Sequence, residues 1–180
     1  MRELSLNVLD IVQNSISAAA TLVTVDVTEA AGMLTIGITD NGRGMTEEQL
    51  NSVRDPFFTT RTTRRVGMGI PLFRMAAEMA DGSFAIESQL GVGTTVTASF
   101  RLDHIDRMPL GDMVGTMETL IQLNPTIDFV YRHTVDKQSF ELDTRELREV
   151  LGDVPLSEPD VLAWISENLA EGIQTVGSNA

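Results

Sequence analysis

The chain has 180 residues, of which 42% are hydrophobic, and it carries a formal net charge of −13 and no cysteine. This length fits one domain with an appendage or two small domains, and the lack of cysteine excludes disulfides, thiolate metal sites and a thiol nucleophile. Residues 1–101 have a net charge of −3 and residues 102–180 a net charge of −10, so we expect no nucleic-acid partner.

Membrane insertion and secretion are not expected. No apolar run approaches the roughly 20 residues of a membrane helix, and the first residues, MRELSLNVLD, lack the apolar core of a signal peptide. We therefore expect a cytoplasmic protein. Its acidic second half is either an ordinary solvated surface or a docking site for a basic protein partner.

Residues 3–19 have the apolar spacing of a helix. Asp10 and Asn14 are four residues apart, so we expect their side chains on one face of this helix, one turn apart. Alternating valines over 23–28 and alternating apolar residues over 34–38 then predict an antiparallel hairpin that ends on Asp40.

Two further helices and two strands follow in the first half. Thr46 and Gln49 have the spacing of a capping box at a helix start. Helical spacing returns over 70–80, and strands are expected from Phe84 and over 94–102. This order predicts a two-layer α/β sandwich of the α+β class, with a mostly antiparallel mixed sheet covered on one face by helices.

The pattern breaks near residues 102–110, so we expect one domain over 1–102 and an acidic α+β extension over 110–180, which forms a small core or packs on the first domain. The extension should contain a helix over 113–121, strands over 127–131 and 140–142, and two more helices. Capping boxes are expected at Asp143 with Glu146 and at Ser157 with Asp160, and the last helix should end at Gly172.

Three glycine pairs stand out. Gly42 and Gly44 follow Asp40, Gly67 and Gly69 precede a predicted helix, and Gly91 and Gly93 run into Thr94. Glycine tolerates positive φ and close contact, so these pairs predict a ligand pressed against the backbone. Together with a carboxylate that reads the ligand, they favour a nucleotide pocket.

Five segments resemble, in order, the motifs of the GHKL (Bergerat-fold) ATPase superfamily, which includes gyrase, heat-shock chaperone, histidine kinase and mismatch-repair types. They are residues 10–18, 40–45, 55–60, 67–70 and 91–94. The third segment, Asp55-Pro56-Phe57-Phe58-Thr59-Thr60, is similar to the phenylalanine box of sensor histidine kinases and favours that branch. The resemblance covers roughly residues 4–101, and residues 103–180 match no family that we recognise.

The resemblance implies that the chain binds ATP with Mg²⁺. Asn14 would be the protein ligand of the metal, since its amide oxygen suits that ion, and Asp40 would accept a hydrogen bond from the adenine amino group. Asp10 stands where the family usually has a catalytic glutamate, so it is the candidate general base. The alternative for Asp10 is an acid on the helix surface that faces water.

The resemblance implies further nucleotide-binding residues. In addition to Asn14 and Asp40 they are Gly42, Gly44, Met45, Arg61, Arg64, Arg65, Gly67, Gly69 and Thr94. Guanidinium groups bind phosphate oxygens well, although each of the three arginines can equally belong to a solvated basic loop. Met45 and Ile38 are candidates for the apolar floor beneath adenine, and core packing explains both nearly as well.

Two kinds of function stay open. We expect no phosphoacceptor helix pair, since few residues precede the first helix, and we expect His104 and His133 to be ordinary surface or turn residues. A gyrase, chaperone or repair motor is excluded on length. The chain is then either a stand-alone ATPase or protein kinase that acts on a partner in trans in signalling, or a non-catalytic ATP-binding module whose acidic tail docks a partner according to nucleotide state.

Overall fold

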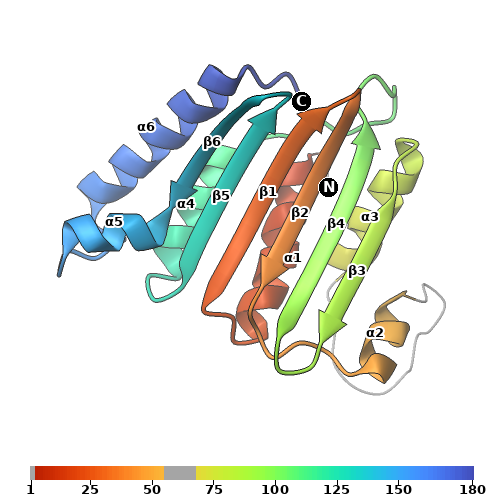
Figure 1. The fold of residues 1–180 in the computed structure, drawn as a ribbon, viewed down its shortest axis with the longest axis horizontal. Coiled ribbons are helices and arrows are strands. Elements are labelled where there is room, and N and C mark those ends of the chain that lie inside the picture. The colour runs from red at the N-terminus through yellow and green to blue at the C-terminus, as the bar shows by residue number, and fades with distance from the viewer. Residues whose placement is uncertain (1–2, 55–67) are drawn as a thin grey trace.

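The computed structural model describes residues 3–54 and 68–180, in which six strands form one sheet with helices packed behind it (Figure 1). In chain order the elements are α1 (Leu4–Ser17), β1 (Leu22–Ala30), β2 (Met33–Asp40), α2 (Glu47–Arg54), α3 (Gly69–Met79), β3 (Phe84–Gln89), β4 (Gly93–Arg101), α4 (Met113–Leu123), β5 (Asp128–Val135), β6 (Gln138–Asp143), α5 (Thr144–Leu151) and α6 (Pro159–Val176). The predicted two-layer fold with a mostly antiparallel sheet is confirmed.

The strand order is β3-β4-β2-β1-β5-β6. Every neighbouring pair is antiparallel except β1 and β5, which run parallel. The predicted hairpin pairs Val23 with Asp40 at one end and Ala30 with Met33 at the other. Its two-residue turn has positive φ at both positions, Ala31 at 52° and Gly32 at 77°. The backbone twist of such a turn matches the right-handed twist of the flanking strands.

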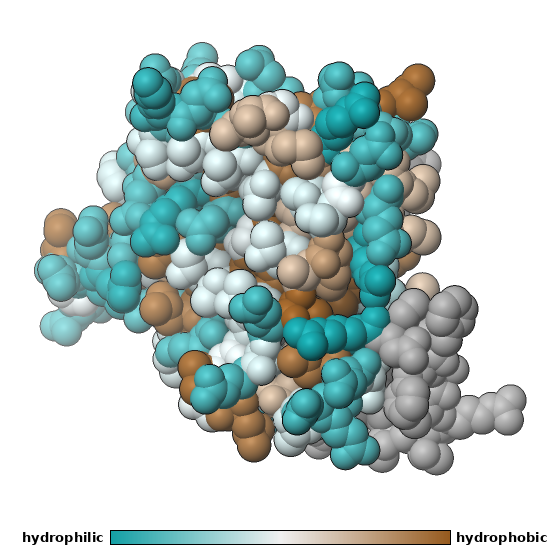
Figure 2. Space-filling model, turned by 45° about the vertical axis from the view of Figure 1, so that its right-hand side comes forward, coloured by the Kyte–Doolittle hydropathy of each residue, from teal (hydrophilic) through white to brown (hydrophobic). Residues whose placement is uncertain are grey.

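The two faces of the sheet differ in polarity because side chains alternate along each strand. In β1, Val23, Val25 and Val27 are buried beneath the helices, whereas the intervening Thr24, Asp26 and Thr28 face outward. The outward face is largely white and teal in Figure 2. One apolar face therefore carries the core, and the opposite face of the sheet is polar.

The C-terminal strands continue the same sheet. β5 pairs with β1 from Leu22–Asp128 to Glu29–Val135, and β6 forms the edge beyond it. α6 lies across these strands at Gly172, where a Cβ atom would come within 2.3 Å of the Phe140 ring. The division into domains 1–102 and 110–180 stays a prediction.

Three predictions for the extension were wrong in detail. α6 does not end at Gly172 but runs to Val176, because Gly172 provides close packing on Phe140 rather than a stop. The helix begins at Pro159 with Glu158 as its N-cap residue, so Ser157 does not cap it. Asp143 caps α5, but it accepts from the backbone N–H of Arg145 and pairs with that side chain instead of forming a box with Glu146.

His133 was predicted to be a surface or turn residue, and this is wrong, since its side chain is 0% exposed. Burial raises the pKa of the Tyr131 phenol, so Tyr131 keeps its proton and can donate it to His133 Nδ1 at 2.8 Å. His133 Nε2 then donates to the carboxylate of Glu29 at 3.0 Å. Ser178 and the backbone N–H of Asn179, beyond α6, donate to the same carboxylate.

We expect Glu29→Gln to lower the free energy of unfolding by about 2 kcal/mol at pH 7, the scale of hydrogen bonds to a buried charged group. Burial by itself would raise the pKa of Glu29, but its hydrogen bonds from Ser178, His133 and Asn179 outweigh burial and hold the pKa below its ordinary value of 4.5. The stabilisation is therefore complete above pH 4.5 and is lost as pH falls through the lower folded-state value.

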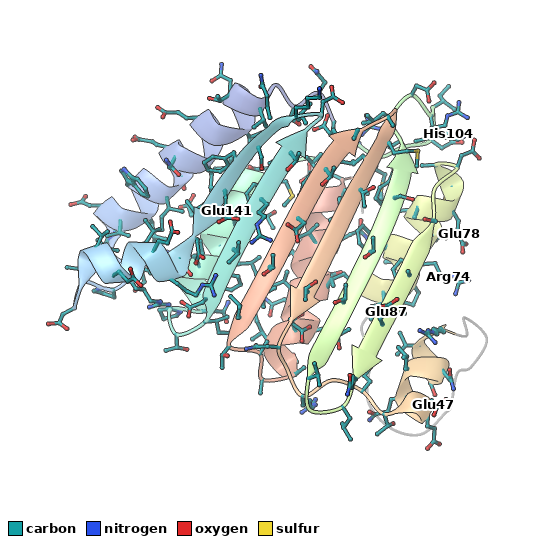
Figure 3. The ribbon with its side chains drawn as sticks, viewed as in Figure 1. Glu47, Arg74, Glu78, Glu87, His104 and Glu141 are labelled. Carbon is teal, nitrogen blue, oxygen red and sulfur yellow. The ribbon has the colours of Figure 1, made fainter. Side chains whose placement is uncertain are left out.

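Urea denaturation between pH 7 and pH 4 measures this difference. Glu141→Gln is the matched control, because Glu141 lies exposed on β6 (Figure 3) and pairs there with Arg132, an arrangement worth about 0–1 kcal/mol. The prediction would be contradicted if both variants lost the same free energy of unfolding. It would also be contradicted if the loss in Glu29→Gln did not become smaller toward pH 4.

Candidate functional site

The candidate site begins on α1. This helix turns Val8, Ile11 and Val12 into the core, which leaves Asp10 exposed and Asn14 half-buried at the edge of the buried face. The helix geometry places these two side chains on the same face, one turn apart, as the sequence predicted.

Asp40 is held by hydrogen bonds to both of its carboxylate oxygens. It is the last residue of β2 and is 9% exposed. Its Oδ2 accepts a 2.6 Å hydrogen bond from the Ser15 hydroxyl, and its Oδ1 accepts one of 2.8 Å from the backbone N–H of Gly42. Asn41 fixes the same corner, because its side-chain oxygen accepts from the N–H groups of Thr21 and Leu22.

Two glycines allow the backbone segments of the site to pack together. Gly44 has φ of +66°, and a Cβ atom there would lie 2.0 Å from the carbonyl oxygen of Gln89. Gly93 has φ of +144°, and a Cβ atom there would lie 1.9 Å from the carbonyl oxygen of Asp40. No other residue type fits either position without displacing backbone. The first and last glycine pairs therefore meet around Asp40.

The start of α3 lies against Asp10. A Cβ atom on Gly69 would be 2.8 Å from the Cβ of Asp10, so the lack of a side chain at Gly69 permits this approach. The first turn of a helix has free backbone N–H groups that attract phosphate. Asp10 thus lies beside a helix end suited to anion binding, with Asn14 one turn farther along α1.

A row of polar side chains crosses the end of the sheet. Ser88, Thr94 and Asp40 are register partners on β3, β4 and β2. On the same face of the sheet, the next row toward its centre is Ile86, Val96 and Ile38, all buried. The oxygen atoms of Ser88, Thr94 and Asp40 therefore lie at the lower end of the sheet in Figure 1, next to the apolar row of the same face.

Met45 lies beside this row. Its side chain is partly buried and packs against the core, and its backbone N–H donates to the Ser88 hydroxyl at 2.9 Å. Ile38 is 1% exposed, so of the two candidates for the adenine floor only Met45 keeps an exposed part. Ile38 therefore packs in the hydrophobic core.

The structure brings together Asp40, Gly42, Gly44, Met45 and Thr94. It places Asp10 against Gly69, with Asn14 one turn along α1 from Asp10; the roles of all these residues in binding stay predictions. The remaining predicted residues lie outside the described residues. They are Arg61, Arg64, Arg65, Gly67 and the segment 55–60.

Arginine side chains hold the helices at either side of this undescribed segment. Arg74 on α3 donates to Glu78 and to the carbonyl oxygen of Arg54, the last residue of α2. Figure 3 labels Arg74 and Glu78 on this helix. Arg54 in turn donates to the carbonyl oxygen of Ile86 on β3. α2 is therefore joined to both α3 and the edge strand.

Ser15 and Ser88 were not among the residues predicted from the sequence. Ser15 directly follows Asn14 in the first motif, and Ser88 lies opposite Thr94 across the β3–β4 hairpin. The hairpin register, counted back from the glycine turn, is the signal that would have identified Ser88.

Chemically, the site combines a fixed carboxylate, a neutral amide oxygen and an exposed carboxylate beside a helix N-terminus. Within 3–54 and 68–180, no three His, Cys, Asp or Glu side chains gather in a way that could hold a metal ion. None of the helices in those ranges is both long and apolar enough to span a bilayer.

Comparisons with known proteins agree with this geometry. The family model for histidine kinase-, DNA gyrase B- and HSP90-like ATPases matches residues 2–104. Sporulation kinase C of Bacillus subtilis is 31% identical over 88 residues, which are 48% of this chain and 20% of that kinase. Sensor histidine kinase ZraS of Escherichia coli is 30% identical over 76 residues, 42% of this chain and 16% of that kinase. These alignments cover a quarter or less of each relative.

Among solved structures, the Aquifex aeolicus MutL ATPase domain complexed with ADP superposes with a TM-score of 0.54 and 14% identity, covering 84% of this chain and 69% of that one. The N-terminal domain of a DNA repair protein gives a TM-score of 0.57 and 15% identity, covering 79% of this chain and 52% of that one. At these identities the likeness shows the fold alone.

Proposed function

The chain belongs to the histidine kinase-, DNA gyrase B- and HSP90-like ATPase family, and from that premise we propose that it binds Mg-ATP at the end of the sheet and transfers the terminal phosphoryl group to water or to a partner protein in trans. Its sequence relatives are histidine kinases, which favours a role in signalling. The chain spans 20% of sporulation kinase C and 16% of ZraS.

The observation that carries the proposal is the fixed carboxylate of Asp40. Ser15 and Gly42 both donate to it, and a carboxylate has about four lone-pair sites, so it can still accept a third hydrogen bond. An acceptor at this position suits the amino group of adenine and opposes the carbonyl group of guanine. Gly44 and Gly93 let the backbone segments beside Asp40 pack closely, so a flat base at this carboxylate would lie near main chain.

The phosphate side of the proposal involves α1 and α3. The backbone N–H groups of Gly69 and Ile70 lie in the first turn of α3, a position that suits phosphate oxygens. The amide oxygen of Asn14 is a hard neutral ligand of the kind that Mg²⁺ accepts. The bound ion would neutralise phosphate charge. Asp10, one turn before Asn14, would accept the proton of the attacking hydroxyl or water.

We expect Asn14→Ala to bind adenine nucleotide with an affinity that no longer depends on Mg²⁺, because the protein ligand of the ion is removed. Calorimetric titration of ADP with Mg²⁺ and with a chelator measures the dependence in wild type and variant. Gln13→Ala is the matched control, since Gln13 is an exposed neighbour on the same helix. A full magnesium effect in Asn14→Ala would contradict the role of this residue.

Phosphoryl transfer is tested with radiolabelled ATP and the proteins encoded beside this chain. The expected result is release of labelled phosphate or transfer of label to one of those proteins, and loss of both with Asp40→Asn, which lacks the base-reading carboxylate. Label that appears equally with Asp40→Asn would come from a contaminating kinase and not from this site.

A second function, a non-catalytic ATP-binding module, is favoured by the C-terminal part. Residues 102–180 carry a net charge of −10, which suits a basic partner, and β5 pairs with β1 along almost its whole length. In this case nucleotide binding would control docking of the partner. ATP binding without turnover or transfer, together with nucleotide-dependent partner binding, distinguishes this function from the first.

A further inference from the structure

Ser88 lies at the centre of a small hydrogen-bond network beside the proposed base site. Its Oγ accepts from the backbone N–H of Met45 at 2.9 Å, lies 3.0 Å from the carbonyl oxygen of Gly93 and lies 2.8 Å from Thr94 Oγ1. These contacts join the glycine loop after β2 to the turn between β3 and β4.

The number of available protons determines which group donates in each hydrogen bond of this network. A serine hydroxyl has one proton and two lone pairs. The N–H of Met45 can only donate and the carbonyl of Gly93 can only accept, so the Ser88 proton points to Gly93. The lone pair that remains on Ser88 accepts the proton of Thr94. Thr94 therefore has no proton left to donate, and its Oγ1 offers only lone pairs to a ligand.

Thr94 stands opposite Asp40 in the β4–β2 register, and Asp40 is also a pure acceptor when ionised. Two acceptors on adjacent strands suit the two protons of an amino group. A carbonyl group, as in guanine or hypoxanthine, would face both acceptors with its own lone pairs. A Thr94 hydroxyl free to rotate would instead turn and donate to that carbonyl.

We propose that Ser88 is a positioning residue that holds Thr94 as an acceptor, so that the site selects 6-amino over 6-oxo purine nucleotides. This inference rests on the proposed function, because it requires a nucleotide base beside Asp40 and Thr94. Ser88 acts through Thr94 and does not need to touch the base.

The test is the ratio of the dissociation constants of inosine diphosphate and ADP, measured by calorimetry with Mg²⁺. Wild type should prefer ADP. Ser88→Ala should lower that preference about tenfold, the worth of one hydrogen bond, because Thr94 becomes free to donate. Ser88→Thr retains a hydroxyl and should keep the preference, as should Ser83→Ala at the far end of the same hairpin, where the hydroxyl bonds Ser99.

A double-mutant cycle separates positioning from a general packing role. In a Thr94→Val background, Ser88→Ala should leave the ratio unchanged, because the group through which it acts is gone. Equal weakening of both nucleotides in Ser88→Ala, or a changed ratio in the Thr94→Val background, would overturn the role of Ser88 while leaving the proposed function in place. Failure of wild type to bind either nucleotide would overturn both.

Discussion

Asp40→Asn is expected to weaken the binding of adenine nucleotide about a hundredfold or more while the chain stays folded. The substitution removes the charge-assisted acceptor for the adenine amino group and can place an N–H₂ group there instead. Loss of such a bond together with a donor facing a donor costs about 2–3 kcal/mol or more, which corresponds to this factor.

The fold should tolerate the change because both internal contacts of Asp40 can be kept. The amide oxygen of an asparagine can still accept from Gly42, and its N–H₂ group can donate to Ser15 Oγ. The Ser15 hydroxyl would then turn toward the carbonyl oxygen of Ile11, which lies 3.5 Å away.

Calorimetric titration with ADP measures the affinity, and thermal denaturation confirms that the variant is folded. Asp26→Asn is the matched control, because Asp26 lies on the neighbouring strand but on the polar outer face, where it pairs with Arg132. It should bind ADP as wild type does. Unchanged affinity in a folded Asp40→Asn protein would remove Asp40 from the binding site and leave the family resemblance as the only support for adenine recognition.

Local sequence patterns predicted the elements of the first half well. Alternating valines gave β1, and the hairpin ends on Asp40 as expected. The capping box at the start of α2 is formed in both directions, from Thr46 N–H to Gln49 Oε1 and from Gln49 N–H to Thr46 Oγ1. Such features depend on residues close in sequence, so they can be recognised without a structure.

Contacts between distant segments could not be predicted in the same way. The parallel pairing of β1 with β5 joins strands whose alternation patterns fit many partners equally well. Gly172 resembled a helix end, but only the position of the Phe140 ring explains a glycine inside α6. His133 was assigned to the surface because nothing near it in sequence identifies Glu29 as its buried partner.

The site was predicted in part for the same reason. Asp40, Gly44 and Thr94 belong to recognisable motifs, and so does Ser15, but the contacts of Ser15 and Ser88 are made to residues on other elements. Serine carries little signal on its own, since it is common in loops and on surfaces. The register of β2, β4 and β3 is what reveals Ser88.

Asp10→Asn is expected to lower ATP turnover by about 10²–10⁴, the range for loss of a general base, with nucleotide affinity nearly unchanged. Asp10 is exposed on α1 and lies against Gly69 at the start of α3, so we expect the substitution to leave the fold intact. Steady-state phosphate release and ADP titration separate the two effects. Asp153→Asn, in the exposed turn between α5 and α6, is the control that should change neither.

Asp10→Glu tests the same catalytic role by lengthening the side chain that carries the carboxylate. Glutamate is one methylene longer and is the usual residue of the family at this position, and a displacement of about 1 Å in a catalytic group can change the rate about a hundredfold. We therefore expect turnover equal to or above that of wild type. Equal turnover in wild type and Asp10→Asn would keep catalysis but assign the base elsewhere. If wild type neither hydrolyses ATP nor transfers phosphate with its partners present, Asp10 has no proton to accept, and the nucleotide acts as a ligand that sets the conformation of the chain.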